Sequence, residues 1–316
     1  MSLFKGIHHA GIGVSDMTES LPFYRDLLGF SDVVADYTGP LPAMERITGR
    51  PQTTARVVFL ANPRASREGP GMVKLVQLQP PDAPDSLPQD MCWGEVGTAE
   101  ICVHVRNLEA TVQRLVTGAG CRQISAIDRG PVPPPRGGEV IYCYLSDPDG
   151  GKIELLEYRS PWAPSVQPQT EGVTHVAFGV SNGEAAKVYY RILGFTIEFV
   201  DFECVQRIMS PWFAQSPDGR QMRLIIMDCP EGGAGIEAVQ QLHRTKDCRG
   251  RWGRVGPMEY AIEVGDIGEA LLVLEEQGVG SLCTPQTVTT DAGCWTYAYL
   301  VEPDGNYVSL IQPEFQ

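Results

Sequence analysis

The segment HAGIGVSDM, residues 9–17, decides the fold because the chain repeats its pattern three more times. The other copies are EICVHVRNL from Glu100, HVAFGVSNG from His175 and EYAIEVGDI from Glu259. Each copy opens with a polar residue, continues as an apolar run to a valine and then reaches a glycine some way along the chain. Such self-similarity indicates a duplicated structural unit. We therefore expect four copies of one unit.

The pattern within each copy predicts a strand, a helix and then about three strands. After the opening run, apolar residues recur at helical spacing, as at Leu108 and Val112, and the following glycine suits a helix C-terminus in left-handed conformation. Pro-Asp-Gly turns then join the last two strands at 147–150, 216–219 and 302–305. The predicted fold class is therefore α+β, built from four βαβββ units.

The length of 316 residues allows two domains of ordinary size. The stretch SPWAPSVQPQTEG, residues 160–172, is the best boundary, so we expect an N-terminal module at 1–160 and a C-terminal module at 161–316. The segment Asp128–Gly138 (DRGPVPPPRGG) is expected to lack regular structure and to act as a lid. Further linkers are expected at Pro80–Gly97 and Cys229–Gly256.

The composition is that of a soluble globular protein, with 43% hydrophobic and 20% charged residues. A formal net charge of -14 argues against nucleic-acid and anionic-membrane partners. We find neither an apolar run of membrane-spanning length nor the pattern of a secretory signal at the start. Nine scattered cysteines are typical of reduced thiols, so the expected location is cytoplasmic.

The residues that open the four copies are His, Glu, His and Glu, all of which can bind a metal ion. Alternation along a strand places Glu100, Cys102 and His104 on one face. The positions four residues after the turn glycines are equivalent in the repeat, and pairing two units should bring them next to the opening residues. The expected first-half set is His9, Glu100 and Glu154 with Lys74 or Gln77, and the second-half set is His175, Arg223, Glu259 and Ser309.

The chain resembles the vicinal oxygen chelate superfamily, which includes glyoxalase I, bleomycin-resistance proteins and extradiol dioxygenases, in its two-module form. The resemblance is carried by IHHAGIGVSD at 7–16, FYRDLLGF at 23–30 and DPDGGKIELLE at 147–157. It implies glyoxalase/extradiol-dioxygenase-like modules whose sheets curl into half-barrels around a cavity. Members run isomerase, epimerase, lyase and dioxygenase reactions, or simply bind ligands, on this scaffold.

The resemblance also implies metal ligands on the first and last strands of each unit. These positions are His9, Glu100 and Glu154 in the first half, although the family usually has His where this chain has Glu100. Lys74 cannot bind a metal while it is protonated. One imidazole and two carboxylates suit Fe, Mn, Zn, Co or Mg alike, so this set of ligands does not identify the metal. With Arg223 and Ser309 at ligand positions, the second-half site is expected to be degenerate.

These observations predict a divalent-metal-dependent enzyme that acts on a small oxygenated organic substrate as an isomerase, epimerase or lyase, through a chelated enolate-like intermediate. Glu100 would be the third ligand or a general base, and His104 a proton relay. Substrate contacts are expected from Tyr142, Tyr144 and Arg223.

Two alternatives stay open. One is an extradiol ring-cleaving dioxygenase with Fe(II), which lacks a second His ligand unless His104 takes that place. The other is a ligand-sequestering protein whose metal site has decayed, as Lys74, Arg223 and Ser309 would suggest. The pairing of the units and the oligomeric state, including a homodimer, are also left open.

Overall fold

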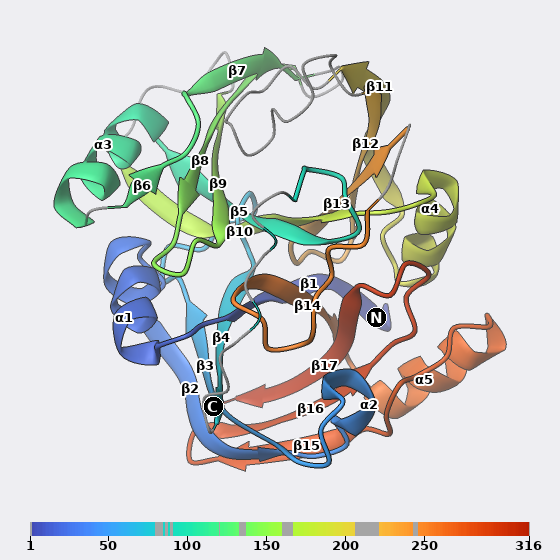
Figure 1. Cartoon of the computed structure of the whole chain (residues 1–316). Helices are drawn as coiled ribbons and strands as arrows, with labels where there is room; N and C mark the ends of the chain where they lie inside the picture. Colours follow the sequence, from blue (N-terminus) through green and yellow to red (C-terminus); the bar gives the residue numbers. More distant parts are fainter. Residues whose placement is uncertain are drawn as a thin grey trace.

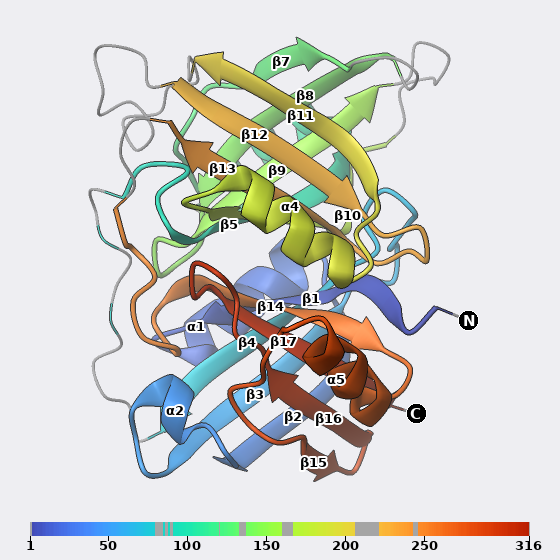
Figure 2. The same cartoon turned by 90° about the vertical axis from the view of Figure 1, so that its right-hand side faces the viewer.

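The computed structural model describes residues 2–79, 85, 88, 91–119, 121–132, 137–159, 167–205, 221–242 and 246–315. These residues form an α+β fold dominated by two curled sheets, as predicted (Figure 1). Figure 2 shows one sheet above the other, with β1 and β14 of the lower sheet next to the upper sheet.

The first sheet has eight strands in the order β15-β16-β17-β14-β1-β4-β3-β2. It joins the first and fourth units through the antiparallel pair β1 and β14. Its strands are β1 (Phe4–Gly13), β2 (Asp32–Leu41), β3 (Thr53–Ala61), β4 (Met72–Gln79), β14 (Gly256–Val264), β15 (Gln286–Thr290), β16 (Gly293–Tyr299) and β17 (Tyr307–Phe315).

The second sheet has nine strands, in the order β11-β12-β13-β10-β5-β9-β8-β6 with β7 paired to β8. It joins the second and third units through the antiparallel pair β5 and β10. Its strands are β5 (Gly97–Arg106), β6 (Arg122–Gln123), β7 (Asp128–Pro131), β8 (Glu139–Ser146), β9 (Lys152–Arg159), β10 (Gln169–Gly179), β11 (Ile197–Val205), β12 (Gln221–Asp228) and β13 (Gly235–Gln241).

The pairing of the units differs from the expected division at 160/161. The middle two units share one sheet and the outer two share the other, so the stretch 160–172 leads between strands of the same sheet. Strands pair through backbone hydrogen bonds, which every opening strand offers alike. Sequence patterns within single units therefore could not decide which units pair.

The Asp or Asn of the repeat caps the N-terminus of a helix in three of the units. The side chains of Asp16, Asn182 and Asp266 accept hydrogen bonds from backbone N–H groups of the first turn. The helices are α1 (Met17–Pro22), continued by the π-helical turn η1 (Phe23–Leu27), and α2 (Glu45–Thr48), α3 (Leu108–Ala119), α4 (Gly183–Ile192) and α5 (Ile267–Glu276).

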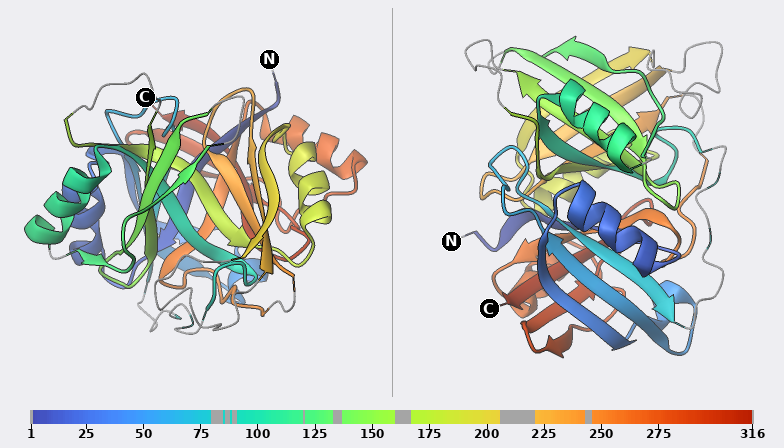
Figure 3. Two further views of the ribbon diagram at one scale, coloured as in Figure 1. Left: turned by 90° about the horizontal axis from the view of Figure 1, so that it is seen from above. Right: turned by 90° about the vertical axis from the view of Figure 1, so that its left-hand side faces the viewer.

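The predicted glycines end three of these helical segments in the left-handed conformation, with φ of 82° at Gly29, 90° at Gly194 and 79° at Gly278. Helices α1 and α3 lie on one side of the molecule and α4 and α5 on the opposite side (Figure 3). Among the described residues, we find no helix whose length and hydrophobicity would let it cross a membrane.

The main core lies between the helices and the sheets and continues between the two sheets. On β5, Ile101, Val103 and Val105 are buried in it, as strand alternation requires. Between the sheets, the Phe178 ring stacks on the Tyr260 ring with centroids 5.0 Å apart. These contacts leave the opposite, concave faces of the sheets for the polar residues of the sites.

Two expectations about loops were wrong. Asp128–Pro131, expected to lack regular structure, forms β7 because its backbone pairs with β8, whereas residues 133–136 lie outside the described residues. The expected linker Cys229–Gly256 contains β13, which pairs with both β10 and β12. The missed strand matters because it carries a residue of the site described below.

Candidate metal centre

The four units place equivalent residues in the same register. Two positions after each opening residue, the first strand pairs in parallel with a last-strand residue: Cys102 with Glu154, Ala177 with Glu237, Gly11 with Lys74 and Ala261 with Ser309. Each sheet therefore holds two opening and two last-strand residues. These sets are Glu100, Glu154, His175 and Glu237 in the second sheet, and His9, Lys74, Glu259 and Ser309 in the first.

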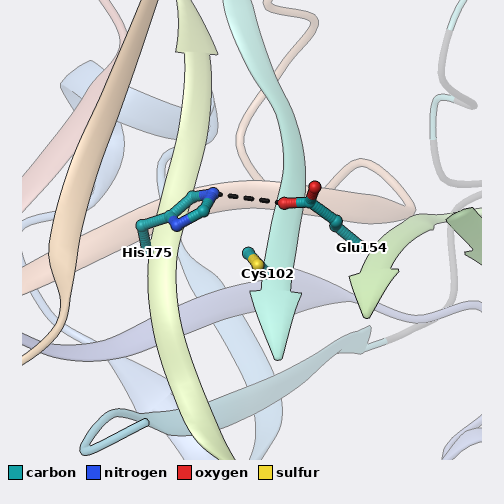
Figure 4. A group of neighbouring side chains, drawn as sticks. All are labelled: Cys102, Glu154 and His175. Carbon is teal, nitrogen blue, oxygen red and sulfur yellow. Dashed lines mark ion pairs between the residues drawn. The ribbon is translucent and has the colours of Figure 1, made fainter. Parts of the chain in front are cut away.

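In the second sheet, three carboxylates and one imidazole converge. Nε2 of His175 lies 3.3 Å from Oε2 of Glu154 and 3.2 Å from Oε2 of Glu237. Ligand atoms of Cys102, Glu154 and His175 all lie within 4.8 Å of one another. Figure 4 shows the imidazole of His175 facing the carboxylate of Glu154, with Cys102 beside them on β5. All of these side chains are buried.

The fourth member, Glu100, is fully buried, and neither of its carboxylate oxygens has a hydrogen-bond partner in the described part of the chain. Burial, followed by the carboxylates of Glu154 and Glu237, raises the pKa of Glu100 well above its usual value, while His175 and the Trp93 indole oppose this shift. A buried carboxyl group without a partner is costly, so Glu100 requires a proton or a cation.

The buried carboxyl groups of the cluster repel one another, and burial disfavours their charged forms. Burial, with a smaller contribution from the Glu154 carboxylate, raises the pKa of Glu237, while His175 opposes this shift. Burial lowers the pKa of His175, but nearby Cys102 and Glu237 outweigh it and leave that pKa well above its usual value. Because metal ligands must give up their protons, we expect a metal ion to displace the protons that these groups hold.

The donor set fits a divalent cation. Carboxylate oxygens and one imidazole suit Mn, Fe, Co or Zn. The oxygens of Glu100 are available as further ligands. Burial and the Glu154 carboxylate raise the pKa of the Cys102 thiol well above its usual value. Because the thiolate is the form that binds metals, Cys102 is a weaker donor than its neighbours.

Two tyrosines of β8 lie on the same side as the cluster, as strand alternation predicted. The Tyr144 hydroxyl donates to Oε1 of Glu154 at 3.4 Å, and the Tyr142 hydroxyl donates to Oδ2 of Asp128 at 3.4 Å. Burial, followed by the charges of Asp128 and Glu154, raises the pKa of Tyr142. Both hydroxyl groups therefore remain protonated near neutral pH and can donate hydrogen bonds.

Comparison with known proteins points to one family. Residues 6–155, a little under half of the chain, match the family model of the Glyoxalase/Bleomycin resistance protein/Dioxygenase superfamily. This stretch of the chain is therefore similar to that superfamily.

The fold of nearly the whole chain is similar to that of two-module solved structures. Glyoxalase I from Zea mays superposes with a TM-score of 0.57 at 18% identity, covering 97% of this chain and 92% of that chain. A putative dioxygenase from Bacillus subtilis superposes with a TM-score of 0.59 at 13% identity, covering 99% and 86%. At these identities the likeness establishes the fold only. A search of curated proteins gave no match.

The predicted ligand set needs correction. Glu100 and Glu154 lie together as expected, but His9 lies in the other sheet, and His175 supplies the imidazole instead. Glu237 was missed because we counted from the turn at 216–219, which lies outside the described residues, and took β12 for the last strand of the unit. The apolar alternation of GIEAVQQ after Gly232-Gly233 was the signal that could have revealed β13.

The structure places two other predicted site residues among different partners. On β12, Arg223 donates to Asp201 at 2.6 Å and to Glu184 at 2.6 Å. On β5, Nδ1 of His104 lies 3.0 Å from Oε2 of Glu171, and Arg106 also pairs with this carboxylate. Both residues therefore bind carboxylates outside the cluster. For His104 the reason is its position four residues along β5 from Glu100, roughly 13 Å at the rise of a strand.

The equivalent set in the first sheet is held together by an internal cation. Lys74 forms an ion pair with Glu259, which also accepts hydrogen bonds from Trp252 and Tyr299. Of the two residues considered for this strand, Lys74 therefore faces the site. Gln77 instead accepts from Met17 N and donates to Ser15 O, beside helix α1. This set has a lysine where the other has a carboxylate.

Proposed function

We propose that this protein is a divalent-metal-dependent enzyme that acts on a small oxygenated organic substrate by proton transfer, as an isomerase, epimerase or lyase. The observation that carries the proposal is a buried cluster in which the carboxylates of Glu154 and Glu237 lie 3.3 and 3.2 Å from the His175 imidazole, with the Glu100 carboxyl buried beside them. The match of residues 6–155 to the superfamily model, and the names glyoxalase I and putative dioxygenase of proteins with similar folds, support a metal-dependent reaction.

The residues that would hold the ion are His175, Glu154 and Glu237, whose donor atoms already face one another. When bound, the ion supplies a Lewis acid that polarises an oxygen of the substrate. The Tyr144 hydroxyl orients Glu154 through its hydrogen bond. The Tyr142 side chain, on the same face of β8, would contact the substrate.

Glu100 would act as the general base in this proposal. It accepts a proton from the carbon beside the carbonyl group of the substrate and returns a proton to the neighbouring carbon in an isomerisation. Burial and the nearby carboxylates raise the pKa of Glu100, which makes its carboxylate a stronger base once it has lost its proton.

The cluster supports extradiol cleavage less well. Iron sites that activate oxygen use two imidazoles and one carboxylate, and the cluster has one imidazole. His104, which was considered as the second histidine ligand, pairs with Glu171 instead, and His9, the first predicted ligand, lies in the other sheet.

The first experiment is elemental analysis of protein purified without chelators or affinity metals, for wild type, Glu237→Gln and Glu259→Gln. Glu259 is a matched control because it belongs to the equivalent set of the first sheet. We expect about one equivalent of a divalent metal in wild type and in the control, and an affinity at least about tenfold lower in Glu237→Gln. Absence of metal from wild type after incubation with each ion would overturn the proposal.

The reaction class is tested by incubating metal-loaded protein in deuterated buffer with carbonyl compounds that carry a second, adjacent oxygen. Deuterium should enter at the carbon beside the carbonyl, and Glu100→Gln should lose this exchange while it still binds metal. Metal binding without exchange, for every compound of this class, would favour a sequestering protein.

A further inference from the structure

A second repeated segment precedes two of the four opening residues. Residues 93–100 read WGEVGTAE and residues 252–259 read WGRVGPME, so Trp, Gly, Val, Gly and Glu recur at the same spacing. The first copy ends at Glu100 on β5 of the second sheet, and the other ends at Glu259 on β14 of the first sheet. Each of these buried carboxylates is therefore preceded, at the same distance along the chain, by a tryptophan.

The two copies follow the same backbone course. The glycines directly after the tryptophans, Gly94 and Gly253, both lie in the left-handed region, with φ of 83° and 88°. Both tryptophans are buried, with 6% of Trp93 and 2% of Trp252 exposed. Each segment thus turns directly after its tryptophan and leaves the indole inside the protein.

Each segment also lies directly against the first strand of the other unit in its sheet. A Cβ atom on Gly179, at the end of β10, would lie 1.9 Å from the carbonyl oxygen of Glu95. A Cβ atom on Gly13, at the end of β1, would lie 1.8 Å from the carbonyl oxygen of Arg254. A side chain does not fit at such distances, so only glycine allows this approach. The shared contacts indicate that the two indoles occupy equivalent places.

In the first sheet, the indole holds the opening carboxylate through a hydrogen bond. Nε1 of Trp252 donates to Oε2 of Glu259, and the Tyr299 hydroxyl donates to the same oxygen. The other oxygen, Oε1, pairs with the ammonium group of Lys74. Because Glu259 is completely buried, these three contacts fix the orientation of its carboxylate.

In the second sheet, the equivalent indole belongs to Trp93 and lies near Glu100. Burial raises the pKa of Glu100, and the Trp93 indole opposes this rise, so the indole stabilises the charged carboxylate. Glu237 occupies the position that Lys74 has in the first sheet, so a carboxylate replaces the ammonium group there. The repeat therefore places Trp93 as the N–H donor beside Glu100.

We propose that Trp93 is a positioning residue: its indole N–H orients the Glu100 carboxylate toward the substrate, as the Trp252 indole orients Glu259. This role rests on the proposed function, in which Glu100 accepts a proton from the carbon beside the carbonyl group. Trp93 acts through Glu100 and not on the substrate. A base that is held by a neighbouring donor needs less reorientation before the proton is transferred.

The kinetic test compares Trp93→Phe with Trp252→Phe as its matched control. Phenylalanine keeps an aromatic ring in place of the indole and removes the N–H donor. We expect both variants to keep the metal content of wild type. In Trp93→Phe alone, kcat for deuterium exchange should fall about tenfold or more, with KM changed by less than about threefold. Trp93→His, which keeps an N–H donor, should recover part of this loss.

Two kinetic outcomes would overturn the proposal. Equal kcat of Trp93→Phe and wild type would mean that the indole N–H does not support the base. Loss of metal together with activity in Trp93→Phe would indicate that the tryptophan only maintains the structure of the site.

A second measurement separates this proposal from the proposed function. In isotope-labelled protein, the NMR signal of the Trp93 indole N–H, assigned by its absence from Trp93→Phe, reports the contact with Glu100 without any substrate. Glu100→Leu removes the acceptor and should shift this signal upfield, while the Trp252 signal stays in place. An unshifted Trp93 signal would overturn the role of this residue. Absence of exchange from wild type, with the shift present, would overturn only the proposed function.

Discussion

At the scale of single residues, burial and hydrogen bonding have opposite effects on the pKa of Glu302. Its Oε2 accepts hydrogen bonds from the backbone of Asp304 and Asn306, whereas its Oε1 has no partner among the described residues. Burial has the larger effect and raises the pKa of Glu302 to about 7 from an ordinary value of 4.5. The folded protein therefore binds this proton more tightly than the unfolded chain does.

This difference predicts a pH-dependent stability. Because the folded-state pKa is the higher one, the contribution of Glu302 is complete below about pH 4.5 and is lost as the pH rises through about 7. Relative to Glu302→Gln, which does not titrate, wild type should lose about 2–3 kcal/mol of unfolding free energy across this range. Urea denaturation of both proteins at several pH values measures the difference. A constant difference would contradict the prediction.

A second prediction at this scale separates Cys102 from the carboxylates beside it. Although its sulfur lies among the candidate ligand atoms, burial keeps the thiol protonated, so it should contribute little to metal affinity. Cys102→Ala should change the dissociation constant for Mn²⁺ by less than about threefold, against about tenfold or more for Glu237→Gln. Titration of metal-free protein gives both values. Equal losses of Mn²⁺ affinity in Cys102→Ala and Glu237→Gln would show that Cys102 is a ligand.

At the scale of elements, the repeated Asp or Asn is a helix cap. The Asn182 side chain accepts a hydrogen bond from Ala185 N at 3.1 Å at the start of α4. Asn182→Ala should lower the unfolding free energy by about 1 kcal/mol, as for other caps of this kind, and should leave metal content unchanged. Ser181→Ala is the control, since it is exposed and its backbone contact to Asp304 survives. Equal stability of the two variants would disprove the cap.

At the scale of the whole molecule, the pairing of units predicts how the chain can be divided. The fragment 1–160 contains Glu100 and Glu154, but His175 and Glu237 lie in 161–316, as does β10, the partner strand of β5. Each fragment alone should therefore fold poorly and bind no metal. Co-expression of the two should restore about one equivalent, as measured on the co-purified pair. Stoichiometric metal in 1–160 alone would mean that a half-chain builds a complete site.

The sequence by itself determined the repeated unit and the local chemistry. The sequence was enough to predict the four copies of one pattern, the helix-capping residues and the glycines that end helices, such as Gly29 and Gly194. Each of these features depends only on neighbours along the chain. The face shared by Tyr142 and Tyr144, and the nearness of Glu100 to Glu154, were also predictable, because strand alternation and one unit's own pairing fix them.

Only the tertiary structure decided which units meet, and so which donors converge. His9 and His175 open equivalent strands, and backbone hydrogen bonds do not distinguish between those strands. Pairing of the middle units brings His175 to Glu154 and Glu237, whereas pairing of the outer units leaves His9 beside Lys74. The packing of two sheets against each other, expressed in contacts such as Phe178 on Tyr260, is a property of the whole chain.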